Sequence, residues 1–552
     1  MVAAWAATAQ AGGPLLYRGA RVVTLDGAVP VAEAVLVDHG RIKTVYARAP
    51  AAAPAGAGVV ELRGGVLVPG LHDAHVHVGG VGRAALTLDL VGTRSAAEVV
   101  QRVAARLEER PGGILVGRGW DQNDWACGKP AVPPCGGTMP TRALLDAVAP
   151  DTPVFLERID GHAAWVNSAA LRLAVEGGAT ALARGGRDPE GGRIHRDGAG
   201  EATGILVDNA MTLVEKQFPA VTPGELQQQY RAGALAAARA GLTSVHEMGA
   251  SLAGLEALRA LDRRGELPVR VFVYLDGMEA GVLDALPAGG IRRAEGRVEV
   301  RGIKLFADGA MGSRGAVMLA PYSDEKGTRG LFVTEPKVLE ARARAANDRG
   351  FQVAIHAIGD AGNREVLGLF ARLGRDAAAR RHRVEHAQVV DPRDWPAFKA
   401  TGAVASMQPT HATSDMPWAE KRLGRDRLRG AYAWKSLAAA GAPLALGSDA
   451  PVEGISPLWG LYAATTRMDQ DGTPGGGWTP GERLSAEDAL RGFTVGAAWA
   501  VAREGELGVV REGALADLTW LSVDPLTAAP AELLRARVLG RMVDGVLERA
   551  ED

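Results

Sequence analysis

The fold of this chain is best read from one stretch near its N-terminal end, Val68-Pro69-Gly70-Leu71-His72-Asp73-Ala74-His75-Val76-His77. Alternate side chains of a β-strand point to the same face of a sheet. His75 and His77 can therefore present two imidazoles to one point at the end of a strand, as a metal ion requires of its first two protein ligands. His pairs at this spacing also arise by chance or on solvated edge strands, so the assignment depends on further ligands elsewhere in the chain.

Length and composition restrict the class of protein. The chain has 552 residues, of which 47% are hydrophobic and 23% charged, with a formal net charge of −2. These values are typical of a globular protein with a large core and more than one domain. The chain has no basic stripe that would indicate a nucleic-acid partner, and no apolar run long enough to span a membrane.

Two features favour export. Residues 1–11 are small and apolar and end in Ala-Thr-Ala-Gln-Ala, which resembles the end of a secretory signal without its basic start. Cys127 and Cys135 lie close together in a segment rich in Gly and Pro and could close a small disulfide, with two free thiols as the alternative. Together they favour a periplasmic protein over a cytoplasmic one.

Both ends of the chain are rich in short apolar runs separated by turn residues. We expect strands at residues 15–17, 21–25, 34–37, 41–46 and 59–62 near the start, and at 507–510, 516–521 and 538–545 near the end. Two β-rich ends around a long middle predict one small β-sandwich domain, built from residues 14–68 and 505–549.

The middle of the chain alternates strands with helical patterns. Eight strands are expected, the first ending at His75 and His77 and the others at residues 243–246, 270–274, 303–306, 353–356, 383–386, 404–408 and 444–449. Helical patterns lie between most of them, including 226–240, 252–264, 336–349 and 363–373. This order predicts a (β/α)8 TIM barrel over residues 69–504. A long insertion follows the first strand, at about residues 80–223, and contains a probable strand at 154–158.

Metal-binding residue types lie at the ends of these strands, where the active site of such a barrel lies. An isolated His in an apolar strand is more often a hydrogen-bonded core residue, but four His and one Asp at one rim are hard to explain in that way. A lysine in an apolar strand is costly as a buried cation, unless its amine is carboxylated to a carbamate that bridges two cations. The candidate ligands are His75, His77, Lys304, His356, His386 and Asp449.

The motifs that contain these residues are 69–77, 303–314, 354–360, 384–388, 408–415 and 447–451, with 117–121 and 160–168 in the insertion. With them the chain resembles the amidohydrolase superfamily of metal-dependent hydrolases over residues 15–545. Within it, the chain is most similar to the amidohydrolase-3 branch, which includes N-substituted formamide deformylases.

The resemblance implies a centre of two zinc ions. His75, His77 and Asp449 would hold one ion, His356 and His386 the other, and a carboxylated Lys304 would bridge them. A bridging hydroxide would attack an amide carbonyl, and Asp449 would act as general base and then general acid toward the leaving amine. Some members of the superfamily use a single metal ion.

The implied reaction is hydrolysis of a non-peptide C–N bond in a small molecule, such as an N-acyl or N-formyl amine. The alternatives are an esterase, lactonase or carbamate hydrolase with the same site, and a non-catalytic regulatory binding protein. The complete set of six ligand positions speaks against the last of these. A homodimer is the default expectation for the assembly.

Five further residues are candidates for substrate contact. His411 follows the seventh strand and could stabilise an oxyanion; a hydrogen-bonded loop His is the alternative. Trp120, Asp121 and His162 lie in the insertion, which could cover the mouth of the barrel as a lid or be a packed structural insert. His246 ends the second predicted strand and could line the pocket.

Overall fold

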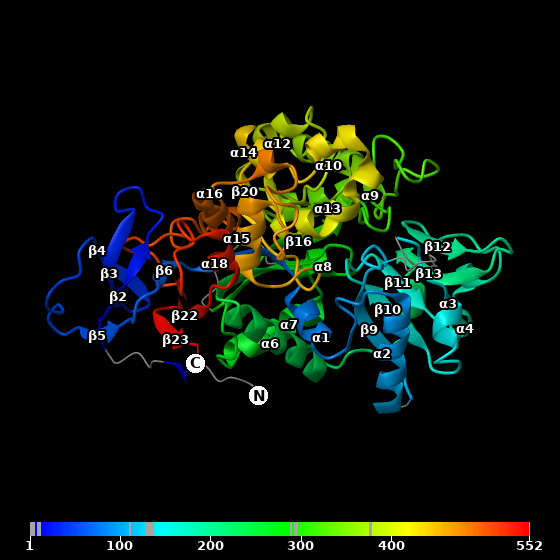
Figure 1. The fold of residues 1–552 in the computed structure, drawn as a ribbon, viewed down its shortest axis with the longest axis horizontal. Coiled ribbons are helices and arrows are strands. Elements are labelled where there is room, and N and C mark those ends of the chain that lie inside the picture. The colour runs from blue at the N-terminus through cyan, green and yellow to red at the C-terminus, as the bar shows by residue number, and fades with distance from the viewer. Residues whose placement is uncertain are drawn as a thin grey trace.

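The computed structural model describes residues 6–7, 13–109, 112–126, 137–286, 290–291, 296–374 and 378–550. A central barrel is flanked by a sheet from the two chain ends on one side and by an inserted sheet on the other (Figure 1). Cys127, Cys135 and most of residues 1–11 lie outside the described residues, so the disulfide and export stay predictions.

The barrel is formed by eight parallel strands, as the sequence predicts. The strands pair in chain order, and backbone hydrogen bonds from Asp449 N to His75 O (2.7 Å) and from His77 N to Ala450 O (2.9 Å) join the last strand to the first. The strands are β7 (Leu71–Val76), β14 (Leu242–Ala250), β15 (Arg270–Asp276), β16 (Val298–Phe306), β17 (Gln352–Ala357), β18 (Arg383–His386), β19 (Val404–Met407) and β20 (Leu444–Leu446).

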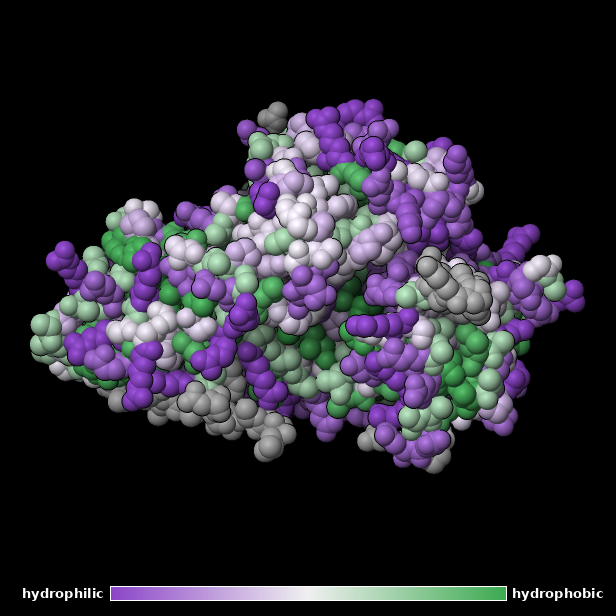
Figure 2. All heavy atoms as spheres, viewed as in Figure 1, coloured by the Kyte–Doolittle hydropathy of each residue, from purple (hydrophilic) through white to green (hydrophobic). Residues whose placement is uncertain are grey.

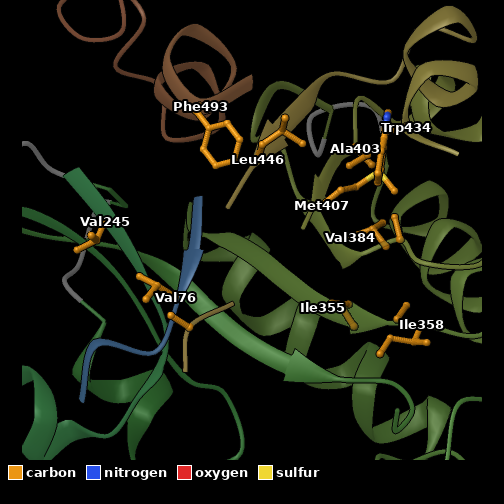
Figure 3. Packing of buried hydrophobic residues seen from close by; sticks show 14 of the residues in the cluster. Val76, Val245, Ile355, Ile358, Val384, Ala403, Met407, Trp434, Leu446 and Phe493 are labelled. Carbon is orange, nitrogen blue, oxygen red and sulfur yellow. The ribbon is translucent and has the colours of Figure 1, made fainter. Parts of the chain in front are cut away.

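Helices cover the outside of the barrel and bury the outward faces of the strands. The predicted helices are present as α6 (Pro223–Arg239), α7 (Leu252–Arg263), α9 (Pro336–Asp348) and α10 (Asp360–Arg372). Apolar side chains of strands and helices form one large cluster, which includes Val76, Ile355, Trp434, Leu446 and Phe493 (Figure 3). Because strands of this kind are buried on both faces, their near-continuous apolar runs are the expected sequence signal.

A close helix contact fixes the segment that follows His77. Helix α1 (Val78–Ala84) packs on α6, which begins with a capping box formed by Thr222 and Glu225. A Cβ atom added at Gly233 would lie 1.9 Å from the Val78 carbonyl oxygen, and one at Gly82 would lie 1.8 Å from that of Gln229. Only glycine permits this approach of the two backbones, and the contact holds α1 beside the barrel mouth.

The sheet from the two chain ends has nine strands and forms the predicted sandwich. The order is β1-β23-β22-β21-β6-β2-β3-β4, with β5 also paired to β2. A backbone hydrogen bond from Ile42 N to Ala514 O (2.9 Å) links β4, at one edge of the sheet, to the segment that precedes β21. Its strands are β1 (Ala6–Ala7), β2 (Leu15–Val23), β3 (Val31–Asp38), β4 (Arg41–Tyr46), β5 (Gly58–Glu61), β6 (Val66–Pro69), β21 (Leu518–Leu521), β22 (Val538–Val543) and β23 (Val546–Arg549).

Two details of this sheet differ from the expected strands. No strand forms at residues 507–510, where Gly508 has a φ of 80° that turns the chain. The expected strand at 538–545 ends at Val543, and Asp544-Gly545 form a turn with positive φ at both residues. Such a turn joins two strands of a hairpin, and the second strand is β23. The domain boundaries at residues 14, 68, 505 and 549 remain a proposal.

The insertion after β7 forms a sheet of its own. Six strands lie in the order β12-β13-β11-β10-β9-β8, and β10 (Val154–Arg158) is the predicted strand. The other strands are β8 (Leu88–Asp89), β9 (Leu115–Trp120), β11 (Ala163–Val166), β12 (Gly192–Arg196) and β13 (Ala202–Asp208). The limits at residues 80 and 223 and the role of a lid stay predictions.

Charged and polar residues cover much of the molecular face shown in Figure 2, interrupted by smaller hydrophobic areas. Within the described ranges, no helix combines the length and the apolar character needed to cross a membrane.

A buried ion pair joins the sandwich to the barrel. Arg270, at the start of β15, donates from Nε to Asp517 Oδ2 (2.6 Å) and from Nη2 to Oδ1 (3.1 Å). We expect Asp517→Asn to lower the free energy of unfolding by about 3 kcal/mol, because a buried arginine loses the carboxylate that it contacts through two donors and keeps only its pair with Asp544. Thermal unfolding measures the change. The control is Glu487→Gln, which alters an exposed pair with Arg491; equal stability of the two variants would contradict the structural role of Asp517.

Candidate metal centre

A cavity of about 530 Å³ lies at the carboxyl ends of the barrel strands. Five of the six predicted ligands line its floor. The sixth, His75, is fully buried behind the floor. Its walls come from the insertion, from helix α13 (Pro409–Leu423) and from the segment after β20. Residues far apart in the sequence therefore meet at one site, as the barrel topology requires.

Asp449 is the carboxylate at the centre of this cluster. Its Oδ1 lies 3.3 Å from His75 Nε2 and 3.2 Å from His77 Nε2, and its Oδ2 lies 3.9 Å from His386 Nδ1. One donor atom from each of His75, His386 and Asp449 lies within 4.8 Å of the others. Asp449 Oδ1 is buried without a hydrogen bond from the described residues, so the donor set suits a divalent cation.

Lys304 reaches the same point from β16. Its Nζ lies 3.4 Å from His75 Nε2, and the residue is fully buried. Burial lowers the pKa of this amine to about 8, against the opposing effect of Glu385 and Asp449. The neutral amine is the form that reacts with carbon dioxide to give a carbamate, so this environment is compatible with the bridging role.

His356 and His386 complete the group. Their ring centroids are 4.6 Å apart, and that of His386 is 4.7 Å from His75. Burial holds the pKa of both imidazoles well below the usual range, so both are neutral, which is the form that binds metal. Gln408 Oε1 lies 2.9 Å from His386 Nδ1 and orients that ring.

The backbone at two of these residues is left-handed. His386 has a φ of 73° and Asp449 a φ of 61°. A non-glycine residue in this region costs about 1–3 kcal/mol and persists only where the surroundings impose it. Asp73 is part of those surroundings: its carboxylate accepts hydrogen bonds from the backbone N–H groups of His75 and Ser448 (3.0 Å each) and from the Ser448 hydroxyl.

Glu385 is a functional residue that the sequence reasoning missed. Its Oε2 lies 2.6 Å from His75 Nδ1, and Arg383 donates to both of its oxygens (2.7 and 3.1 Å). Although burial raises its pKa, Arg383 and His75 bring the pKa down to about 2. The carboxylate is therefore charged and orients His75. The signal that could have identified it is a pair of charged residues, Arg383 and Glu385, at alternate positions of the short strand that ends at His386.

Three of the five predicted substrate contacts line the cavity. His411 Nε2 lies 3.5 Å from Asp449 Oδ2, and Asp121 lies on the wall from the insertion. His162 Nδ1 lies 2.6 Å from Asp208 Oδ1, and its ring centroid is 4.9 Å from that of His356. Burial alone would lower the pKa of His162, but the Asp208 carboxylate raises it to about 9.

The other two predicted substrate contacts, His246 and Trp120, do not lie at the cavity. Strand β14 continues to Ala250, so His246 lies four residues before its end, inside the barrel, with Nδ1 2.9 Å from Arg383 Nη1. Trp120 is buried in the inserted sheet, where its indole N–H donates to Leu156 O (2.7 Å). Neither side chain lines the cavity.

A comparison with known protein families shows to which family the chain belongs. The model of a family described as "Amidohydrolase family" matches residues 58–547. The chain belongs to the amidohydrolase family. It is thus a metal-dependent hydrolase, and the implied class of carbon–nitrogen bonds other than peptide bonds agrees with its relatives.

Relatives of this amidohydrolase match it over most of their length. The N-substituted formamide deformylase of Arthrobacter pascens is 28% identical over 564 residues, which cover 97% of this chain and 98% of that protein. The protein LONG AFTER FAR-RED 3 of Arabidopsis thaliana is 33% identical over 531 residues, 92% of this chain and 87% of that protein. The crystal structure of an uncharacterized metal-dependent hydrolase from Pyrococcus horikoshii is similar with a TM-score of 0.73 and 27% identity, and the match covers 94% of this chain and 99% of that chain.

The position of Glu385 behind His75 leads to a prediction. We expect Glu385→Gln to weaken metal binding by roughly 10–100-fold, because the oriented, charged partner of a ligating imidazole is lost. Titration of the metal-free protein with zinc measures the change.

The matched control is Glu299→Gln. Glu299 is also a buried carboxylate paired with arginine, 2.9 Å from Arg503. It lies near the start of β16, at the end of the strand away from Lys304 and the cavity. This variant should bind zinc as the wild type does, and an unchanged zinc affinity in Glu385→Gln would contradict the assigned role.

Proposed function

We propose that this amidohydrolase cleaves the C–N bond of a non-peptide amide, such as an N-acyl or N-formyl amine. The observation that carries the proposal is Asp449, whose two oxygens lie between His77, His75 and His411 on the floor of the cavity. A carboxylate in this position can exchange a proton with both an attacking water and a leaving nitrogen. The relative named N-substituted formamide deformylase, which matches almost the whole chain, supports the choice of an amide.

We assign the six ligands to two zinc ions. His75, His77 and Asp449 would hold one ion, His356 and His386 the other, and a carboxylated Lys304 would bridge the pair. Ions bound there would polarise the amide carbonyl and lower the pKa of water toward neutrality. The neutral imidazoles, and an Asp449 Oδ1 that accepts no hydrogen bond from the described residues, support this assignment.

The proton follows one route in the proposed reaction. Asp449 accepts a proton from the attacking water as the O–C bond forms, and then delivers it to the nitrogen as the C–N bond breaks. The products are a carboxylic acid and an amine. His411, whose Nε2 lies 3.5 Å from Asp449 Oδ2, is placed to orient the substrate carbonyl.

Replacement of Asp449 tests the route. We expect Asp449→Asn to lower kcat for N-formyl amines by roughly 10²–10⁴-fold, since the amide side chain cannot carry the proton. The exposed Asp471→Asn variant is the control and should keep wild-type kcat. Zinc content is measured on both proteins, and an active Asp449→Asn with bound zinc would contradict the proposal.

A panel of substrates tests which type of bond the enzyme cleaves. N-acyl and N-formyl amines should be hydrolysed faster than esters and lactones with the same substituents, measured as kcat/KM on zinc-loaded protein. Faster hydrolysis of the esters would favour the alternative activity, and a wild-type protein that binds no zinc and hydrolyses neither series would exclude the proposed enzyme.

Lys304 gives a separate prediction. Lys304→Ala should lose bound zinc and activity, and short carboxylic acids such as acetate should restore part of both by replacing the carbamate. Metal analysis and kcat with and without acetate provide the measurement, and Lys399→Ala, an exposed lysine, is the control. Full activity of Lys304→Ala without acetate would rule out the bridging role.

A further inference from the structure

One part of the cavity wall is acidic. Asp121, Asp124, Asp415 and Glu453 line it, together with one arginine, Arg158. Arg158 is almost fully buried and is committed to its neighbours: Nη2 donates to Asp121, Nη1 to Asp160, and Nε to Gln122 Oε1 (2.8 Å). Three of its five N–H groups are engaged in these bonds, and two of them go to carboxylates, so the charge of Arg158 is already balanced.

Asp415 and Glu453 form no ion pair with any residue that the structure describes. Asp415 is held firmly, because Gln388 Nε2 (2.7 Å) and the Tyr432 hydroxyl both donate to its Oδ2. Its Oδ1 accepts no hydrogen bond in the described part of the chain. Burial raises the pKa of Asp415 well above its usual range, and burial with neighbouring carboxylates raises that of Glu453 to about 7. The charge of Arg158 acts on Asp415 without a direct contact, and burial outweighs it.

Helix α13 connects this wall to the reacting groups. His411, Ser414, Asp415 and Trp418 line the cavity with the spacing of one helix face. His411 is nine-tenths buried, and its Nε2 points into the cavity without a hydrogen bond from the described residues. The rise over four residues places Asp415 about 6 Å along the helix from His411, and Trp418, whose ring centroid lies 5.6 Å from the Arg422 guanidinium, lines the cavity beyond it.

The ligand that would balance the negative charge of this wall is a cation. A substrate carboxylate would face Asp415 and Glu453 beside an arginine whose charge is already paired, and a neutral chain would leave both acids without a charged partner, whereas a cation would stabilise their ionised form. We propose that the cavity selects amides that carry a positive charge a short alkyl chain away from the amide, such as mono-N-acylated diamines, with Asp415 and Glu453 as specificity-determining residues. This substrate class rests on the proposed amide hydrolysis.

Three amides of equal length test the selection. They are N-formylcadaverine with a terminal ammonium, neutral N-formylhexylamine, and N-formyl-ε-aminocaproate with a terminal carboxylate. We expect kcat/KM on zinc-loaded protein to be at least 10-fold higher for the cationic amide than for the neutral one, and lowest for the anionic one. Equal values, or a preference for the carboxylate, would overturn the proposal.

Variants assign the effect to the two residues. Asp415→Asn and Glu453→Gln should each reduce the ratio of kcat/KM between the cationic and the neutral amide by about 5- to 10-fold. The control is Glu420→Gln, an exposed residue on the far side of the same helix, which should leave the ratio unchanged. An unchanged ratio in both Asp415→Asn and Glu453→Gln would also overturn the proposal.

A binding measurement separates the subsite from the reaction. Calorimetry on zinc-loaded protein should show cadaverine binding at least 10-fold more tightly than pentylamine, because both offer one amine to the centre and only cadaverine offers a second cation. The difference should vanish in Asp415→Asn. If no amide is hydrolysed but this difference is found, the proposed function fails and the cationic subsite stands; if amides are hydrolysed and the difference is absent, the subsite fails alone.

Discussion

The backbone hydrogen bond from Asp449 to the carbonyl oxygen of His75 joins the last barrel strand to the first. The same contact brings the Asp449 carboxylate to the imidazoles of His75 and His77. Asp73 reinforces the joint, because it accepts hydrogen bonds from both sides, from His75 and from Ser448. Closing the barrel and assembling the proposed metal ligands are therefore one structural event, and a barrel open at this joint would have no complete site.

The contact between the last strand and the first carries an energetic cost, because it includes buried charges and left-handed residues. The charges are paired inside the barrel. Buried charges are tolerated when they are paired and hydrogen-bonded. Arg383 contributes to this balance at several points, since it donates to both oxygens of Glu385, to the Ala74 carbonyl (2.6 Å) and to Ser406 Oγ (2.8 Å). Glu385 then contacts His75, so a continuous polar network runs from the barrel interior to the ligands. The left-handed residues His386 and Asp449 lie at the end of this network, where packing imposes their conformation.

The sequence predicts the barrel because its signal is local. Each strand is a short apolar run with a polar residue at its end, and the parallel order brings those ends together, so the positions of His356, His386 and Asp449 follow from the pattern. The missed features depend on tertiary structure. The extra length of β14 puts His246 inside the barrel, and the inserted sheet buries Trp120 in its own core. Glu385 could be assigned to His75 only once the two strands were known to face each other across the barrel.

The metal ligands and the acidic wall come from different parts of the fold, and this separation explains how one scaffold can serve several substrates. The ligands lie on barrel strands or directly after them, where the strand order determines their positions. The wall comes from α13, the insertion and the segment after β20, which can change without moving a ligand. Asp449 and Glu453 connect the two parts: the left-handed turn at Asp449 directs the following residues along the cavity, so that the segment with a proposed metal ligand also provides a carboxylate of the wall. A change of substrate charge therefore requires new side chains at Asp415 and Glu453, while the backbone at Asp449 must stay as it is.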